Sequence, residues 1–496
     1  MSSNCGQRFL IANEELKVGP DLSGSRLPVA IVLPLILVGL FVFPAACAQS
    51  WSIAPRTWHV SVGAQSDDMA VQADAYYPHV ITIDVGDKVV WTLNSDEPHS
   101  VTFFGTCQDF TSLSCFQPSL IPCLTSGALD FVPCSLSSYD GIGLASSGRM
   151  IQPGYNWDDS VAHGPATYSL IFTNPGVDIY FDVSALGMRG IVIVNPAGTP
   201  YPFNQQQYSQ QSKQELKSDL MAGAQTLESF QSPASTMGLG NTQIHHVTAG
   251  LSAPQLARAI LKSSADSRIR GTASLSGTAQ GPAENITVKV NVSGLVPSSV
   301  HSVRILLGVC GAEAPSATLL ALPTFVLNNV TARLDGRGSS TTVISSLPSA
   351  NGPAVLRIPS AGWFISVGTC SGFDTGLAAC GNVVFHNASV MRFLPGKLRV
   401  NVGDTIVWTD SPNGVHSVAF LAGHSLPLIP GYVFTIPTGN ATSYDGSSFF
   451  DSGTMRPGSS FVLTLTKPGV YRYVDVFLSF LGMQGSIIVR ADSPDE

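Results

Sequence analysis

The stretch PHVITIDVGDKVVWTLNSDEPH, residues 78–99, returns at residues 395–416 as PGKLRVNVGDTIVWTDSPNGVH. In both copies apolar and polar residues alternate up to a Val-Gly-Asp triplet, and a run containing Val-Trp-Thr follows it. Alternation with a period of two predicts half-buried strands, and Val-Gly-Asp predicts the tight turn between them. The repeat therefore predicts two copies of one β-domain.

Two further blocks recur in the same order. SYDGIGLASSGRM at 138–150 returns as SYDGSSFFDSGTM at 443–455. GVDIYFDVSALGMRGIVIV at 176–194 returns as GVYRYVDVFLSFLGMQGSIIV at 469–489. Short strands with turn signals over about 100 to 140 residues predict a β-sandwich for each copy.

The length and composition bound the class of protein. The 496 residues allow about three domains of ordinary size. Hydrophobic residues make up 44% of the chain, which excludes a disordered protein. Only 12% of the residues are charged, and the formal net charge is −8. Because nucleic-acid binding needs clustered Lys and Arg, we expect no nucleic-acid partner.

An apolar segment near the N-terminus predicts the compartment. Residues 27–48, LPVAIVLPLILVGLFVFPAACA, end in Ala46-Cys47-Ala48. This pattern predicts a secretory signal peptide cleaved after Ala48, with an uncleaved membrane anchor and a lipid-modified Cys47 as alternatives. All three place the rest of the chain outside the cytoplasm. We therefore expect an extracellular or cell-surface protein that contacts a membrane only through this segment.

Composition shifts divide the chain into five predicted segments. Residues 197–265 are Gln-rich, and helices are expected near Gln206–Phe230 and Pro254–Lys262. Residues 266–386 return to strand-like alternation. The segments are a signal peptide or anchor (1–48), a first β-domain with a Cys-rich loop (49–196), a helical linker (197–265), a third β-domain (266–386) and the second copy (387–492).

Seven cysteines remain after residue 48. Their spacing in a secreted chain predicts disulfides, and zinc binding is the rival interpretation, although no C-x-x-C pair occurs. The pairing within the first group and the fate of Cys370 stay open. The first group is Cys107, Cys115, Cys123 and Cys134, and the second is Cys310, Cys370 and Cys380.

Taken together, the repeated blocks resemble those of the extracellular plastocyanin-like cupredoxins, over residues 56–195 and 388–491. The resemblance implies a Greek-key β-sandwich and a type 1 copper site made of two imidazoles, one thiolate and a weak axial thioether. The early histidine of that site corresponds to His99 and His416. The late methionine corresponds to Met188 and Met483.

Both copies depart from this ligand set at the thiolate. Asp182 and Asp475 stand where the resemblance places the cysteine. Ala185 and Leu478 stand where it places the second histidine. Blue-copper chemistry is therefore not supported in either copy.

What remains of the set is interpreted as vestigial or weakly metal-binding. We expect each aspartate to bond the loop backbone or the retained histidine, and the methionines to fill the core. A site for a hard metal ion, made from the histidine and the aspartate, is the alternative. The candidates are His99, Asp182, Met188, His416, Asp475 and Met483.

The third β-domain resembles copper–zinc superoxide dismutase-like and CHRD-like β-sandwich proteins. The resemblance rests on SGLVPSSVHSVRILLGVCG at 293–311, LDGRGSSTTV at 334–343, GWFISVG at 362–368 and ACGNV at 379–383. It implies a Cys310–Cys380 disulfide. Arg304 and Leu306 replace the expected His-x-His pair and Gly368 replaces another histidine, so superoxide dismutation is not expected.

Elsewhere the sequence offers little chemistry. No G-x-S-x-G, phosphate-binding loop or H-E-x-x-H occurs, so we expect no catalytic residues. We expect His79 to be exposed and the adjacent pair His245-His246 to lie on the surface of a polar linker.

The function predicted from the sequence is that of a secreted or surface-anchored, redox-silent cupredoxin-like protein. It is not an enzyme and acts in extracellular binding or envelope architecture. No cofactor is expected, and the partner is an extracellular protein or glycan. The alternative is a copper-binding protein for electron transfer or copper handling, with copper as its cofactor. Fold resemblance alone transfers neither activity.

Overall fold

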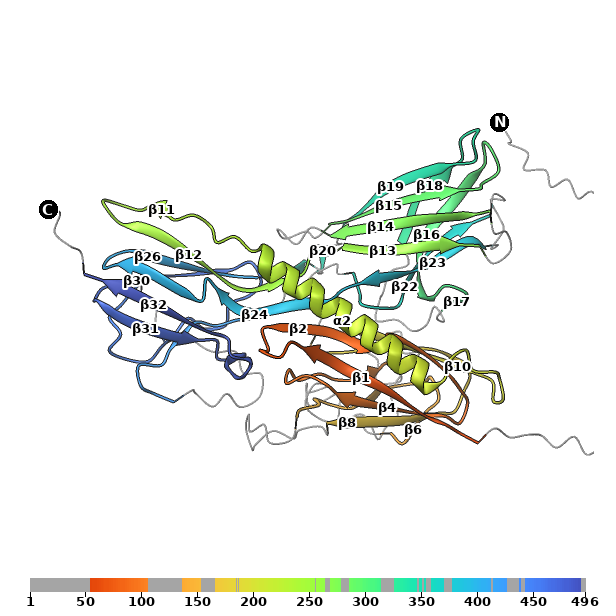
Figure 1. Cartoon of the computed structure of the whole chain (residues 1–496), viewed down its shortest axis with the longest axis horizontal. Helices are drawn as coiled ribbons and strands as arrows, with labels where there is room; N and C mark the ends of the chain where they lie inside the picture. Colours follow the sequence, from red (N-terminus) through yellow and green to blue (C-terminus); the bar gives the residue numbers. More distant parts are fainter. Residues whose placement is uncertain are drawn as a thin grey trace, which may run out of the picture.

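The structure of the chain is a computed structural model. It describes residues 54–105, 136–152, 166–183, 185, 187–254, 256–263, 268–277, 285–313, 325–345, 348–349, 352–353, 358–369, 377–411, 414–425, 437–438 and 442–491. These residues form mainly β-strands, and α2 (Gln205–Ser229) is their one α-helix (Figure 1). The predicted all-β fold is confirmed. The N-terminal apolar segment lies outside the described residues, and so do five of the seven cysteines that follow residue 48: Cys107, Cys115, Cys123, Cys134 and Cys370.

The first sandwich packs two sheets around an aromatic core. Trp58, Trp91 and Tyr180 are almost completely buried between the sheets. One sheet has the order β2-β1-β4-β8-β6, with β2 Val71–Tyr77, β1 Thr57–Gln65, β4 Lys88–Leu93, β8 Thr167–Phe172 and β6 Ser138–Tyr139. The other has the order β3-β10-β9-β5-β7, with β3 Val80–Asp84, β10 Arg189–Asn195, β9 Gly176–Phe181, β5 Thr102–Phe103 and β7 Ala145–Ser146.

The second sandwich repeats both strand orders around Trp408 and Tyr473. One sheet has the order β24-β12-β26-β30-β28, with β24 Ala388–Leu394, β12 Gln243–Ser252, β26 Thr405–Asp410, β30 Ser460–Leu465 and β28 Ser443–Tyr444. The other has the order β25-β32-β31-β27-β29, with β25 Lys397–Asn401, β32 Gln484–Arg490, β31 Gly469–Val474, β27 Ala419–Phe420 and β29 Phe450–Asp451.

One sheet runs through both sandwiches. Strand β2 of the first pairs antiparallel with β24 of the second, with Val71 opposite Val390 and Ala73 opposite Ala388. The result is an 11-stranded sheet in which equivalent strands follow each other in mirrored order from the β2–β24 pair. The short strand β11 (Thr236–Met237) adds to β12 at its side. Each copy thus covers the inner edge strand of the other.

Helix α2 covers this junction. Figure 1 shows it running obliquely over β2 and β24, the two strands that join the sandwiches. The helix begins with a capping box in which the side chain of Asn204 accepts from the N–H of Gln207, and the Gln207 side chain accepts from the N–H of Asn204. Gly223 faces the junction of β2 and β24, because a Cβ on it would lie 2.3 Å from Cγ1 of Val71 on β2. The helix therefore packs unusually close to the sheet.

The predicted linker, residues 197–265, is helical only in its first part. The helix expected near Gln206–Phe230 is present as α2. The prediction of a helix near Pro254–Lys262 is wrong. Leu256–Lys262 forms strand β13, which pairs with strands on both sides. The prediction rested on Ser252, Ala253 and Pro254 as an N-cap and first turn. The alternating burial along β13 shows that the segment is a strand, because sheet pairing outweighs these local signals.

The middle domain consists of one strongly curved sheet. Its strands β18 (Phe325–Thr331) and β19 (Gly338–Ser345) meet where Nδ2 of Asn328 donates to the carbonyl oxygen of Thr341 at 2.7 Å. The order is β17-β16-β22-β23-β13-β14-β15-β19, with β18 beside β16. The strands are β14 Arg270–Gly277, β15 Asn285–Ser293, β16 Val300–Val309, β17 Ala312–Glu313, β18 Phe325–Thr331, β19 Gly338–Ser345, β22 Trp363–Gly368 and β23 Leu377–Phe385. Two short strands, β20 Pro348–Ser349 and β21 Gly352–Pro353, form a separate two-stranded sheet.

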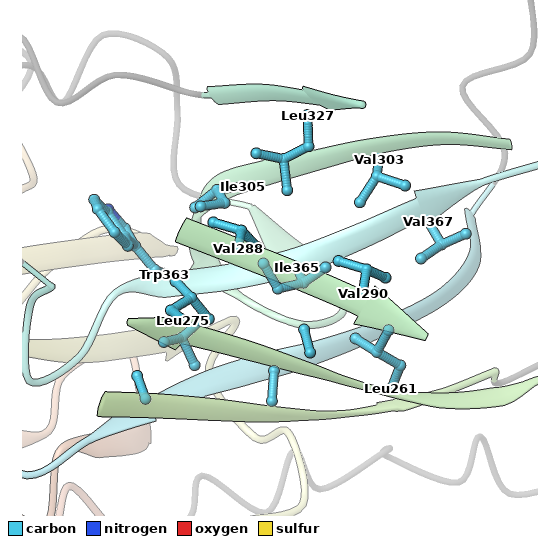
Figure 2. Close-up of a cluster of buried hydrophobic side chains, with 14 of the residues drawn as sticks. Leu261, Leu275, Val288, Val290, Val303, Ile305, Leu327, Trp363, Ile365 and Val367 are labelled. Carbon is cyan, nitrogen blue, oxygen red and sulfur yellow. The ribbon is translucent and has the colours of Figure 1, made fainter. Parts of the chain in front are cut away.

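The core of the middle domain fills the space inside this curved sheet. Figure 2 shows Val288 and Val290 of β15, Val303 of β16 and Ile365 of β22 pointing toward one another. This arrangement explains the alternation seen in the sequence, because every second residue of each strand faces the core.

The first sandwich and the middle domain are packed together. Ile179 and Ile191 of the first sandwich belong to the same buried cluster as Trp363 of the middle domain. The backbone N–H of Arg189 donates to Oγ of Ser360 at 2.9 Å. Among the described residues, no helix is both long and apolar enough to cross a membrane.

Candidate functional site

The first sandwich brings His99 and Asp182 together. His99 follows β4 and is held by a backbone bridge to Met150, while Asp182 directly follows β9. Nδ1 of His99 lies 2.6 Å from Oδ2 of Asp182, and His99 is only 1% exposed. Ser100 Oγ donates to the other carboxylate oxygen at 3.1 Å and accepts from the N–H of Val183. The aspartate thus holds both the imidazole and the loop.

The second sandwich repeats this arrangement. Nδ1 of His416 lies 2.7 Å from Oδ2 of Asp475, and both residues are fully buried. The N–H of Phe477 donates to Oδ1 of Asp475 at 2.8 Å, and the N–H of Val476 donates to Ser417 Oγ. The loop after β31 is therefore held in the same way as the loop after β9.

These residues do not fit a type 1 copper ion. Such a site needs a thiolate, and both copies place a carboxylate there, already engaged by the imidazole Nδ1. Leu478 caps the short 3-10 helix η3 (Ser479–Leu481) and offers no ligand atom. Met188 and Met483 lie in the hydrophobic cores of their sandwiches, 1% and 0% exposed. The residues at the two sites therefore do not support copper redox chemistry.

Beyond Nδ1, the two imidazoles have different neighbours. In the first sandwich, Asp74, Glu97 and His99 each offer a ligand atom, and these atoms lie within 4.8 Å of one another. In the second, Oδ1 of Asp410 lies 3.7 Å from Nε2 of His416. Sequence reasoning missed Asp74, Glu97 and Asp410, because nothing in the repeat predicts which side chains face the second nitrogen.

Burial and charge shift the pKa values of these groups. Burial lowers the pKa of His99, but the hydrogen bond and charge of Asp182, together with Glu97 and Asp74, outweigh it and raise the pKa to about 9. Burial raises the pKa of Glu97 to about 8, and Asp74 adds to this shift. Burial likewise raises the pKa of Asp410 to about 8. Each cluster therefore carries fewer negative charges than its carboxylates suggest.

The aspartate of Val-Gly-Asp has a structural role in both copies. Asp87 accepts from Nε1 of Trp58 at 2.8 Å, and Asp404 lies 3.1 Å from Nε2 of His245. His245 is 7% exposed, so the prediction that it lies at the surface is wrong. It is buried because its strand, β12, belongs to the second sandwich.

His79 was also predicted to be exposed, and that prediction is wrong as well. It is 9% exposed, and its Nε2 lies 3.9 Å from Oδ2 of Asp219 on α2. Tyr77 donates its hydroxyl to the same oxygen at 2.7 Å, and Nδ1 of His386 lies 2.6 Å from Oδ1. The buried carboxylate of Asp219 thus ties the helix to both sides of the junction.

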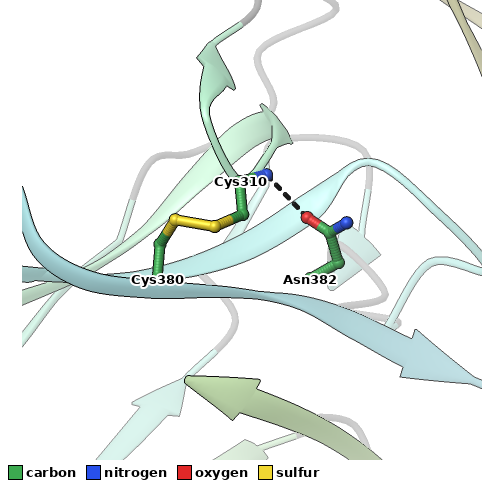
Figure 3. Close-up of a disulfide and its surroundings, with 3 residues drawn as sticks. All are labelled: Cys310, Cys380 and Asn382. Carbon is green, nitrogen blue, oxygen red and sulfur yellow. Dashed lines mark hydrogen bonds between the residues drawn. A yellow bond between two sulfur atoms is a disulfide. The ribbon is translucent and has the colours of Figure 1, made fainter. Parts of the chain in front are cut away.

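The middle domain contains the disulfide implied by its resemblance. Cys310 and Cys380 are bonded, with their Cα atoms 5.5 Å apart, and the N–H of Cys310 donates to Oδ1 of Asn382 (Figure 3). His301, the histidine kept near the expected ligands, is used structurally. Its Nε2 lies 2.7 Å from Ser299 Oγ and its Nδ1 lies 2.8 Å from the carbonyl oxygen of Gly368.

A cavity of about 910 Å³ lies at one end of the middle domain, between β13, β14, β15 and the turn before β19. It is mixed in character, with apolar contributions from Ile260, Ile269 and Val292. No ion pair links its cationic side chains to a described residue. Those side chains are Lys262, Arg270, Arg333 and Arg337.

Comparison with known proteins gives matches among solved structures. No protein-family description and no curated protein matches the chain. Similar solved structures include three of amicyanin: an oxidized methionine-to-leucine mutant (24% identity, 19% of this chain and 70% of that chain, TM-score 0.14), a reduced tryptophan-to-tyrosine mutant (25%, 20% and 74%, 0.15) and a Cu(I) methionine-to-alanine mutant (24%, 20% and 74%, 0.15). These TM-scores are too low to support an argument. Both sandwiches are cupredoxin-like in their strand orders and repeated blocks.

Proposed function

We propose that this protein is a redox-silent, secreted or surface-anchored scaffold that acts by binding rather than by catalysis or electron transfer. The observation that supports this most is the carboxylate at the thiolate position in both sandwiches. Asp182 and Asp475 bond Nδ1 of His99 and His416 at 2.6 and 2.7 Å. An imidazole whose Nδ1 is held in this way, without a thiolate beside it, lacks the ligands for fast copper redox chemistry.

The binding role is proposed for the middle domain. Its cavity is lined by four cationic side chains on a chain whose net charge is −8. A local excess of positive charge attracts anionic groups, and Arg binds carboxylate or sulfate in a bidentate manner. We infer an anionic extracellular glycan as the partner. We also infer that this domain is superoxide dismutase-like or CHRD-like in fold. The disulfide between Cys310, directly after β16, and Cys380 on β23 supports this inference.

The redox-silent role is tested with copper. The mature full-length chain is purified without chelators, mixed with copper and examined by metal analysis and visible spectroscopy. We expect no intense thiolate-to-copper absorption. Stoichiometric copper that is lost in Met188→Leu or Met483→Leu would contradict the proposal, because methionine belongs to the type 1 ligand set.

A matched variant shows that the assay detects such a site. Asp475→Cys combined with Leu478→His restores both missing ligand types in the second sandwich, whose residues 387–492 contain no cysteine. We expect this variant alone to gain the visible absorption. If wild type and variant absorb equally, the thiolate position does not decide the chemistry.

A further inference from the structure

We propose that Asp74, Glu97 and His99 form a binding site for one Zn²⁺ ion, coordinated through Nε2 of His99. This site is separate from the copper position implied by the cupredoxin resemblance, because Asp182, which stands at the thiolate position, faces Nδ1 instead. It is compatible with a redox-silent protein, because Zn²⁺ does not change oxidation state.

The donor set suits zinc. Two carboxylates and an imidazole offer one nitrogen and two oxygens, all within 4.8 Å of one another. Zn²⁺ binds such ligands at about 2.0–2.2 Å and takes a water molecule as a fourth ligand. Two carboxylates also balance the charge of the ion. Glu97 lies in a loop and is partly exposed, so the ion has a route from solvent.

The hydrogen bond of Asp182 supports the assignment independently. A histidine that binds a metal through one nitrogen commonly donates its other N–H to a carboxylate, which fixes the tautomer and the ring orientation. Nδ1 of His99 lies 2.6 Å from Oδ2 of Asp182. Nδ1 keeps its proton in this bond. A pKa of about 9 favours a second proton on Nε2, which zinc displaces when it binds there.

The backbone of β1 makes room for Nε2. The register between β1 and β2 shifts between Val62 and Ala64, which places Gly63 at a bulge, and Asp74 lies on the opposing part of β2. Gly63 has a φ of 67°, and a Cβ there would lie 2.4 Å from Nε2 of His99. Nε2 is therefore directed toward the bulge, on the side where Asp74 lies.

Glu97 completes the cluster. Its Oε2 is buried and has no hydrogen-bond partner among the described residues. Burying a carboxylate oxygen without a partner is costly, and a bound cation removes that cost. The neighbouring residue Asp96 is anchored by Gln65, whose side chain bonds both its N–H and its carboxylate. The loop that carries Glu97 is thus held against β1.

The second sandwich serves as an internal comparison. Its imidazole is held by Asp475 in the same way, but Met391 and Gly414 occupy the positions of Asp74 and Glu97. Only Asp410 faces Nε2 of His416 there, among the residues that the structure describes. One carboxylate and one imidazole are too few for tight zinc binding. The proposal therefore predicts one zinc ion per chain and not two.

The test is a zinc titration of the full chain, with free thiols alkylated, in competition with a chromophoric chelator. We expect one ion per chain and at least a tenfold loss of affinity in Glu97→Gln, in Asp74→Asn and in Asp182→Asn. Asp410→Asn, in the second sandwich, is the matched control and should bind as wild type does. Substitution with Co²⁺ gives a spectroscopic signature of the same site.

Three outcomes would overturn the proposal: no stoichiometric zinc, affinity unchanged in Glu97→Gln, or equal losses in Asp410→Asn. Circular dichroism and thermal unfolding confirm that each variant is folded before its affinity is compared. Glu97→Gln is the decisive variant, because this residue lies in a partly exposed loop and its amide keeps the shape of the side chain.

Discussion

At the scale of single residues, His416 shows what the fold tolerates in its interior. Its imidazole is completely buried between Asp475, bonded at 2.7 Å, and Asp410, at 3.7 Å. Neither carboxylate oxygen of Asp410, nor Nε2 of His416, has a hydrogen-bond partner among the described residues. Leu93 occupies the position of Asp410 in the first sandwich, so the polar residue is not required by the fold.

The pH dependence of this cluster follows from the pKa of Asp410, which burial raises from 3.8 to about 8. A carboxyl whose pKa is raised by folding contributes stability that is fully present below about pH 4 and is lost as pH rises through about 8. The pKa of His416 is also raised: burial opposes this, but Asp475 and Asp410 outweigh burial. Its contribution is present below about pH 6.5 and is also lost on the alkaline side.

We therefore predict that Asp410→Leu increases the free energy of unfolding at pH 9 by about 1–3 kcal/mol, the cost of burying a polar group without a partner. The increase should be smaller at pH 5, where Asp410 is protonated. Urea unfolding followed at both pH values measures it. A variant that is less stable than wild type at pH 9 would mean that the ionised carboxylate is compensated.

Sequence reasoning at this scale reached the residues that the repeat defines. It placed Asp182 and Asp475 near the retained histidines, and in the structure each aspartate is hydrogen-bonded to the histidine of its own sandwich. It missed Asp74 and Glu97, because Asp74 reaches His99 only through the pairing of β1 with β2 and the bulge at Gly63. Strand register is not written in the spacing of the motif.

At the scale of elements, α2 and the β2–β24 pair depend on each other. The helix is polar over most of its surface, and its buried residues are Tyr208, Asp219 and Gly223. Asp219 accepts from Tyr77 on one side of the junction and lies 2.6 Å from Nδ1 of His386 on the other. The helix therefore acts as a brace across the two sandwiches and not as a free linker.

We predict that Gly223→Ala destabilises the protein, although alanine favours an exposed helix by about 1 kcal/mol. The added Cβ would lie 2.3 Å from Val71 Cγ1 and 3.2 Å from Ala388 Cβ, so the helix or the side chain of Val71 must shift. We expect a loss of about 1–3 kcal/mol in denaturant unfolding. Adding Val71→Ala should recover part of the lost stability. A Gly223→Ala variant that is more stable than wild type would contradict the prediction, because it would show that the space between α2 and β2 accommodates a methyl group.

The strand β12 was the main element that sequence reasoning missed. A short signal was available: His-Val-Ser-Val-Gly at 59–63 and His-Val-Thr-Ala-Gly at 246–250 occupy equivalent places beside Trp91 and Trp408. The spacing of this pair differs from that of the main repeat, because the middle domain is inserted after β12. A search at one fixed spacing cannot find it.

At the scale of the whole molecule, the charge is unevenly distributed. The chain carries a net charge of −8, yet one cavity of the middle domain is lined by four cationic side chains. Charge effects between exposed groups extend over about one Debye length, about 8–10 Å at ordinary salt. The positive charge of the cavity therefore acts on nearby groups and is not cancelled by distant negative charges. An anionic polymer can therefore bind there despite the overall charge.

We predict that the protein binds dextran sulfate but not neutral dextran, and that rising salt weakens the binding. Arg333→Gln with Arg337→Gln should reduce the affinity at least tenfold, measured by calorimetry. Arg399→Gln with Arg456→Gln makes the same change of charge on the second sandwich and is the control. Equal losses in both pairs would assign the binding to overall charge and count against the cavity.

The mirrored 11-stranded sheet also constrains the order in which the molecule is completed. During synthesis the first sandwich and α2 leave the ribosome long before β24, so the hydrogen-bonding edge of β2 stays unpaired until β24 is made. Strand β12 waits as well, since the rest of its sandwich follows the whole inserted middle domain. Unpaired edges are sites of wrong association between nascent chains. The polar helix α2, which packs against β2 in the finished molecule, is made before β24.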